Sequence, residues 1–266
     1  MRKRLILLIL VFLTGLSLLL YPTVSNRWNT LRQSRVITQY AQQVVRLDDR
    51  DYGRLWSDAE AYNQTLADNA TRYAMTDPER AAYERLLNIS GDGIMGYIEI
   101  PSIQCSLPIY HGTGDSVLQT ALGHIEGTSL PVGGAGTHCV LSGHRGLPGA
   151  RLLTDLDKLT EGDRFLLRVL DETLIYEVDQ IRIVEPQELD ALAIEPDKDY
   201  CTLVTCTPYG VNTHRLLVRG RRVEQPETAV RLSADAMRIE PTAVASLAAA
   251  PILLILLAVL LTRRKK

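Results

Sequence analysis

The stretch at residues 201–222 constrains the fold of this chain most. It holds two runs rich in β-branched and apolar residues, at 201–205 and 212–218, and such runs are typical of strands. Between them, Pro208 cannot donate to a strand ladder and Gly210 permits a positive φ. The sequence therefore predicts two consecutive strands that run back on each other across a tight turn.

Two residues beside this turn are suited to chemistry. Cys206 ends the first strand, where functional side chains are usually placed, and Arg215 lies early on the second strand and can face the same opening. Cys201 precedes Cys206 by an odd number of positions, so the two side chains point to opposite faces of the strand. These two cysteines cannot easily form a disulfide with each other.

Both ends of the chain are apolar and carry basic residues at the terminus. A basic segment at 1–4 precedes an apolar run over 5–20, and an apolar run over 242–262 is followed by four Arg and Lys residues at 263–266. The second run is long enough to span a bilayer, and it lacks the polar face expected of the alternative, a core helix. The first run fits a signal peptide or an uncleaved anchor, and the lack of a clear cleavage site favours the anchor.

The positions of the basic residues predict both termini in the cytoplasm and the catalytic part on the extracellular face of the cell membrane. Without the seven terminal basic residues, 22 Lys and Arg remain against 31 Asp and Glu, a net charge near −9. This balance argues against nucleic acid as a partner. Membrane lipid is the expected partner of the two ends.

The middle of the chain is predicted to be mainly β. Short apolar runs alternate with turn residues, which is typical of a sandwich or barrel. Short helical turns are expected near 115–121 and 150–159. The predicted strands are at 96–100, 106–110, 139–141, 164–169, 174–183, 201–205 and 213–218.

The region before the strands is predicted to be helical. Apolar residues recur at helical spacing within 26–72, which favours a helical spacer; a solvated spacer and a regulatory arm are equally compatible with it. Thr76-Asp77-Pro78-Glu79 then predicts a new helix, because Pro is tolerated at the first helical position.

A cysteine nucleophile needs a nearby base or cation to become a thiolate. His144 is the best-placed candidate, because it follows an apolar strand within a glycine-containing loop. His214 neighbours Arg215 on a strand and is expected to face the other way. The remaining histidines are expected at the surface or in structural hydrogen bonds; they are His111, His124 and His138.

Acyl transfer also requires donors for the tetrahedral oxyanion. Arg215 suits this role because its planar guanidinium is permanently charged; the alternative is a surface ion pair. The alternative for Cys206 is a small buried hydrophobe, an interpretation that fits Cys139 and Cys201 better. Four further arginines are expected to be solvated or structural; they are Arg145, Arg219, Arg221 and Arg222.

Four segments together resemble the sortases, and specifically the class C, pilin-polymerising sortases of Gram-positive bacteria. They are MGYIEIP at 95–101, GHIEGTSLPVGG at 123–134, SGHRG at 142–146 and TLVTCTPYGVNTHRLLVRG at 202–220. The resemblance covers roughly residues 75–222. It implies a closed eight-stranded β-barrel and a catalytic triad of His144, Cys206 and Arg215. It also implies a C-terminal membrane helix.

The resemblance implies transpeptidation at an LPxTG-like sorting signal. Cys206 would attack the carbonyl of the signal's Thr, His144 would pass the proton to the leaving amine, and Arg215 would hold the oxyanion. A Lys amine of the next pilin subunit would resolve the thioacyl-enzyme, so the partners are pilin precursors. No metal or other cofactor is expected. Substrate-binding or lid roles are expected for Asp77, Pro78, Thr205 and Tyr209.

One departure from class C concerns the lid, in which Asp-Pro is often followed by an aromatic residue over the cysteine. Here Asp77-Pro78 is followed by Glu79. Tyr73 or Tyr83 is the candidate to take the place of the missing aromatic residue. Asp77 is expected either to cap the helix that begins at Pro78 or to latch the segment to Arg215. Two other functions compete: a surface cysteine peptidase that transfers the acyl group to water, and a membrane-anchored scaffold without activity.

His144 and Cys206 each follow another cysteine, Cys139 and Cys201, by five positions. If their strands are parallel neighbours, these two cysteines form a buried thiol pair beneath the site, with a disulfide less favoured.

The expected organisation is an N-terminal anchor at 1–21, a helical spacer at 22–74, a lid and connecting helix at 75–93, the catalytic barrel at 94–222, a linker at 223–241, a transmembrane helix at 242–262 and a basic tail at 263–266.

Overall fold

The computed structural model of the chain describes residues 2–67 and 69–224. The predicted C-terminal membrane helix, the basic tail and nearly all of the linker lie outside the described residues. Within the described chain, residues 2–25 belong to one unit, and the residues from Asn26 onward form a second compact unit.

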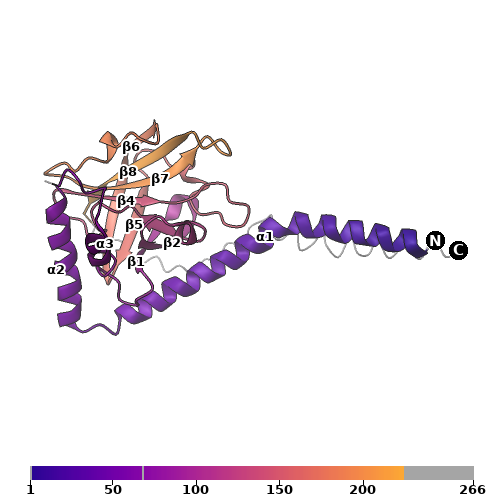
Figure 1. Cartoon of the computed structure of the whole chain (residues 1–266), viewed down its shortest axis with the longest axis horizontal. Helices are drawn as coiled ribbons and strands as arrows, with labels where there is room; N and C mark the ends of the chain where they lie inside the picture. The colour runs from indigo at the N-terminus through magenta and orange to yellow at the C-terminus, as the bar shows by residue number, and fades with distance from the viewer. Residues whose placement is uncertain (1, 68, 225–266) are drawn as a thin grey trace. The chain divides into compact units, whose positions relative to one another are not determined.

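Eight strands of the second unit close into a barrel (Figure 1), in the order β1-β2-β3-β4-β7-β8-β6-β5. The pairs β2–β3 and β4–β7 are parallel. The closed eight-stranded barrel that the resemblance implies is confirmed. The strands are β1 (Ile94–Ile100), β2 (Cys105–His111), β3 (Leu122–His124), β4 (Thr137–Ser142), β5 (Arg164–Val169), β6 (Glu172–Val184), β7 (Asp199–Thr207) and β8 (His214–Val223).

Strand β3 is the one that the sequence pattern does not predict. It has three residues, all buried, which is too short for an alternating pattern to show. It is held by pairing with two distant strands, parallel to β2 and antiparallel to β4. The predicted helical turns are shorter than expected: α4 covers Asp115–Leu118 and a 3-10 turn covers Leu156–Lys158.

The two strands around the predicted turn pair as expected. β7 and β8 are antiparallel, and Cys206 lies directly opposite Arg215. Leu141 and Leu203 belong to the main core inside the barrel. Val204 and Leu217 belong to a second apolar cluster and, because side chains alternate along a strand, lie on the outer face.

The helical region before the barrel consists of two long helices and one short one. α1 (Arg2–Val44) and α2 (Asp49–Leu66) divide the single helical region expected at 26–72. The break falls where Asp48 accepts a hydrogen bond from the amide of Asp51 at 2.7 Å and caps α2. By length and composition, the N-terminal part of the chain holds a candidate membrane span in α1.

Side-chain hydrogen bonds attach α2 and the part of α1 that belongs to the second unit to the barrel. The hydroxyl of Tyr40 donates to the Met95 carbonyl at 3.0 Å and accepts from the Leu170 amide at 2.8 Å. On α2, the amide group of Asn63 donates to the Leu130 carbonyl and accepts from its amide. Figure 1 shows α2 and α3 (Asp77–Tyr83) beside the strands.

Candidate active site

The parallel pair β4–β7 brings two sequence-distant loops to the same edge of the barrel. The ladder begins where Thr137 pairs with Asp199, has Cys139 paired with Cys201 within it, and ends where Ser142 pairs with Val204. His144 and Cys206 each lie two positions beyond the last of these pairs. The equal spacing of each functional residue from its strand cysteine therefore places both at the same edge.

Two hydrogen bonds extend the connection beyond the strand ladder. The amide of Gly143 donates to the Val204 carbonyl at 3.0 Å, and the buried hydroxyl of Thr205 donates to the Gly143 carbonyl at 2.8 Å. The backbone of His144 is held in turn by the Leu153 amide, which donates to its carbonyl at 3.2 Å. Thr205 thus positions the His144 loop, and the substrate contact expected of it stays a prediction.

Cys206 and Arg215 share the outer face of the barrel. Both side chains are half-buried, and both follow the register of the outer apolar cluster, two positions from Val204 and Leu217 respectively. The Arg215 guanidinium donates through Nη1 to the carbonyls of Asn212 at 3.3 Å and His214 at 3.1 Å. Within residues 2–67 and 69–224, no further hydrogen-bond partner is found for this guanidinium, so its remaining donors can bind a ligand beside the cysteine sulfur.

His111, His124 and His138 form structural hydrogen bonds, as expected. Both ring nitrogens of His111 lie 2.8 Å from backbone carbonyls. The His124 ring lies 2.8 Å from the Tyr83 hydroxyl and 2.8 Å from the Ser129 carbonyl. Among the described residues, no hydrogen-bond partner is found for the ring of His144, which is half-buried. This imidazole is therefore free to act on a neighbouring group.

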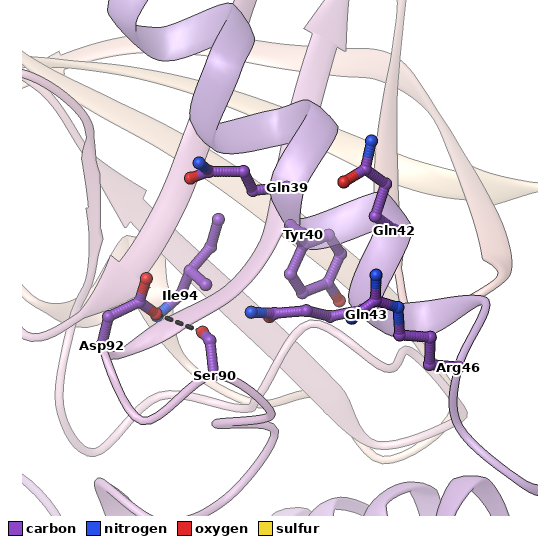
Figure 2. Close-up of a pocket in the computed structure, with 8 residues that line it drawn as sticks. All are labelled: Gln39, Tyr40, Gln42, Gln43, Arg46, Ser90, Asp92 and Ile94. Carbon is purple, nitrogen blue, oxygen red and sulfur yellow. Dashed lines mark hydrogen bonds between the residues drawn. The ribbon is translucent and has the colours of Figure 1, made fainter.

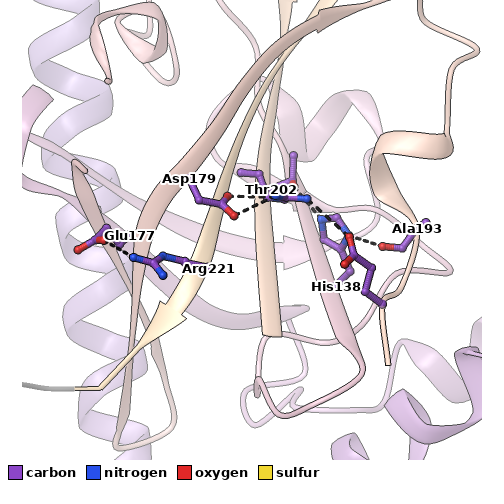
Figure 3. Close-up of polar contacts among 8 residues, drawn as sticks. His138, Glu177, Asp179, Ala193, Thr202 and Arg221 are labelled. Carbon is purple, nitrogen blue, oxygen red and sulfur yellow. Dashed lines mark hydrogen bonds and ion pairs between the residues drawn. The ribbon is translucent and has the colours of Figure 1, made fainter. Parts of the chain in front are cut away.

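His138 holds the segment that follows β6 against the outer face of the barrel (Figure 3). Its Nδ1 lies 2.8 Å from the Ala193 carbonyl and must carry the proton, since a carbonyl only accepts; its Nε2 then accepts from the Thr202 hydroxyl at 2.7 Å. Leu192, the preceding residue, packs in the outer apolar cluster. Burial lowers the pKa of His138, and nearby Arg219 adds to this effect.

The predicted pairing of Cys139 with Cys201 is confirmed. They are direct partners in the parallel ladder, and both are buried and free. Burial raises the pKa of Cys201 well above its ordinary value and raises the pKa of Cys105 to about 12. Cys105 and Cys201 are therefore poor nucleophiles, and Cys139 is enclosed in the core at 2% exposure, in contrast to the half-buried Cys206 at the strand end.

The segment predicted as a lid begins α3, and the expected cap is wrong in detail. The N-cap is Thr76, which forms a capping box with Glu79. The Thr76 amide donates to the Glu79 carboxylate at 2.7 Å, and the hydrogen bonds from Thr76 lower the pKa of Glu79. Asp77 is an exposed residue of the first helical turn. Glu79, which stands where the lid motif would carry its aromatic plug, therefore lies in the first turn of α3 and bonds to its cap.

Contacts on either side of Asp77 bind this segment to the loop after β3. Arg80 forms an ion pair with Glu126 at 3.0 Å, and Gly127 packs against the backbone of Arg72. Tyr83 is fully buried in the main core, so the expectation that it substitutes for an aromatic plug is wrong. The latch between Asp77 and Arg215 stays a prediction.

A polar cavity of about 340 Å³ lies apart from these residues (Figure 2). It is lined by α1 and by the loop before β1, including Gln39, Gln43, Arg46 and Asp92. None of its lining residues is His144, Cys206 or Arg215. Within the described chain, no group of three or more His, Cys, Asp or Glu side chains is arranged to hold a metal ion.

Comparison with known proteins relates this fold and site to one family. A model of the sortase domain matches residues 98–223. The chain is 53% identical to sortase C1 of Streptococcus agalactiae, covering 72% of this chain and 100% of that structure, with a TM-score of 0.70. It is 43% identical to sortase C of Streptococcus pneumoniae, covering 72% of this chain and 97% of that structure, with a TM-score of 0.65.

Among curated proteins, the similarity is to shorter regions. The chain is 30% identical to sortase D of Bacillus subtilis over 131 residues, which are 48% of this chain. It is 29% identical to sortase A of Streptococcus agalactiae over 117 residues, which are 43% of this chain. The chain spans 63% and 47% of the lengths of these two relatives.

Acid should loosen the barrel through His138. The pKa of His138 is lower in the folded chain than in the unfolded chain, so the unfolded chain binds the proton first as the pH falls. The stability that the neutral ring contributes is therefore complete above about pH 6.5, the ordinary pKa of His, and is lost as the pH falls below it. Arg72, Arg219 and Glu195 face this ring. The melting temperature should fall between pH 7.5 and 5.5, and the fall should be smaller in His138→Gln. An exposed control, His214→Gln, should behave as wild type; equal acid sensitivity in all three proteins would contradict the assignment.

Asp77 should not control access to Cys206. Since Asp77 lies in the first turn of α3, Asp77→Ala removes a favourable charge at a helix N-terminus, worth about 0.3–1 kcal/mol. We expect a slightly lower melting temperature and an unchanged rate of Cys206 alkylation. Thr76→Ala is the matched variant and should destabilise more, because it removes the capping box. Faster alkylation in Asp77→Ala at an unchanged melting temperature would instead support the latch.

Proposed function

The chain belongs to the sortase family, its structural relatives are class C sortases, and we propose that it is a cysteine transpeptidase that links pilin subunits into pili. The observation that carries this proposal is the direct cross-strand pairing of Cys206 with Arg215, beside the loop that holds His144. This arrangement supplies a nucleophile, a base and an oxyanion donor at one edge of the barrel.

The proposed reaction begins at Cys206. Its sulfur, as thiolate, attacks the carbonyl carbon of the Thr in an LPxTG-like signal and forms a tetrahedral oxyanion. Arg215 donates to this oxyanion through the N–H groups of its guanidinium that do not bond to the turn. His144 gives its proton to the departing Gly amine, so the peptide bond breaks and a thioester remains on Cys206. The neutral imidazole is then ready to act as a base.

The second half of the reaction transfers the acyl group. The amine of a Lys on another pilin subunit attacks the thioester, His144 accepts the amine proton, and the Cys206 thiolate leaves as an amide bond forms. The sortase C structure of S. pneumoniae bears on pilin substrate specificity, and this similarity supports pilin precursors as the substrates. A cysteine peptidase would differ only in using water at this step, and an inactive scaffold would form no thioester.

The proposed location is the cell membrane, with the barrel on the extracellular face. The apolar part of α1 supports anchoring at the N-terminal end. We place the second membrane helix at 242–262 from its sequence, with both termini cytoplasmic by the positive-inside rule.

The role of Cys206 is tested by trapping the thioacyl-enzyme on the full-length chain with a sorting-signal peptide, with and without an amine acceptor. Cys206→Ala should give no adduct and no product. Cys105→Ala, Cys139→Ala and Cys201→Ala should still form the adduct, because Cys139 and Cys201 are enclosed in the core and the Cys105 thiol donates to the Leu152 carbonyl and has a pKa raised to about 12. An adduct on Cys206→Ala would refute the nucleophile, and release of acid in place of amide when acceptor is present would favour the peptidase.

The role of Arg215 is tested by exchanging it for lysine. Arg215→Lys keeps the charge and loses the planar donor fork, so the rate of thioester formation should fall by about 10²–10³, the effect of removing one oxyanion donor. Arg221→Lys is the matched control, because Arg221 lies on the same strand and pairs with Glu177 at 2.9 Å. Turnover near wild type in Arg215→Lys would show that the planar guanidinium is not required to bind the oxyanion.

A further inference from the structure

The loops that carry His144 and Cys206 meet a second time beyond these two residues. The ring of Tyr209, in the turn after β7, packs against Gly146, so closely that a Cβ at position 146 would lie 2.6 Å from Cε2 of the ring. The guanidinium carbon of Arg145 lies 5.9 Å from the centre of the same ring. Contact between the loops is therefore made by the two residues that directly follow His144.

Arg145 is held rigidly for a residue in a surface loop. Its Nη2 donates to the carboxylate of Asp157, and its side chain is only 11% exposed. Its Nε is covered and finds no hydrogen-bond partner in the described chain. A covered donor without a partner is unfavourable for stability. The position of Arg145 is thus not explained by stability alone, and such groups call for a functional explanation.

Gly146 is fixed from two further directions. Its amide donates to the Thr154 hydroxyl at 3.1 Å, and its φ of +77° is one that a side chain would strain. A residue other than glycine at this position would both strain the backbone and displace the Tyr209 ring. The loop can approach the ring this closely because position 146 has no side chain.

The two loops are thus connected on both sides of His144 and Cys206. On the barrel side, Gly143 is bonded to Val204 and Thr205. On the solvent side, Arg145 and Gly146 contact Tyr209. His144 lies between the two connections on one loop, and Cys206 lies between them on the other.

We propose that Arg145 and Tyr209 are positioning residues, which hold the His144 ring at the distance from Cys206 that thiolate formation requires. This inference rests on the proposed function. A thiolate paired with an imidazolium forms only while the two groups stay within reach. A displacement of about 1 Å can cost about 10²-fold in rate, so loosening one of the two connections should be measurable.

The test uses the full-length chain in detergent and measures alkylation of Cys206 by iodoacetamide, followed by peptide mass mapping. The readout is the ratio of the rate at pH 7 to the rate at pH 10, where a thiol ionises without help from a neighbour. Tyr209→Leu and Arg145→Gln should each lower this ratio by about 10- to 100-fold. The double variant should show no further loss, since both residues act through one contact.

Two variants serve as controls. Tyr209→Phe should keep the wild-type ratio, because the aromatic face that Arg145 contacts remains. Val211→Ala should also keep it, because Val211 lies in the same turn and is similarly exposed, at 65% against 60% for Tyr209. Melting temperatures of all variants show that a lowered ratio reflects a displaced loop in a folded protein.

The outcomes separate this inference from the function on which it rests. A wild-type ratio of alkylation rates in Tyr209→Leu would overturn the positioning role. If the same variant also had a raised KM for the sorting peptide, Tyr209 would be a substrate contact instead. If wild-type Cys206 itself reacted at pH 7 no faster than a cysteine in an unfolded peptide, and formed no thioester, the proposed function would fail first.

Discussion

The parallel pairing of β4 with β7 is the interaction on which the site depends. It joins strands some sixty residues apart in the chain, with Cys139 opposite Cys201 and Ser142 opposite Val204. Parallel strands point their carboxyl ends the same way, so the loops that follow them open at the same edge of the barrel. The buried residues of this ladder contribute to the core. His144 and Cys206, two positions beyond its end, are available for catalysis.

The rest of the site is held by side chains bonded to backbone. Thr205 fixes the loop of His144, and His138 fixes the segment that covers the outer apolar cluster. On the helical side, Tyr40 and Asn63 attach α1 and α2 to the strands. Each is a buried polar group, and leaving such a group without its partner costs about 1–3 kcal/mol. The barrel supplies the overall frame, and these bonds set the finer positions of the loops.

Much of this arrangement could be predicted from sequence because it follows from period and spacing. The alternation of side chains places Cys206 and Arg215 on one face, and equal spacing predicts a buried pair of Cys139 and Cys201 if their strands are parallel neighbours. β3 could not be predicted, because three residues show no period and their partners are distant. The predicted start of α3 is one residue too late, since Thr76 and Asp77 are both good caps and only the bond between Thr76 and Glu79 distinguishes them. The contact between Arg145 and Tyr209 depends on tertiary structure and has no local sequence pattern.

The central claim is that the ladder brings the His144 ring within reach of the Cys206 sulfur. It is tested most directly by NMR titration of the His144 ring in the wild-type chain and in Cys206→Ala. If the ring and the sulfur share a proton, removal of the sulfur must change the titration curve of the ring, while the curve of the exposed His214 stays the same. Two identical His144 curves in proteins of equal stability would show that the two residues do not interact, and would contradict the account.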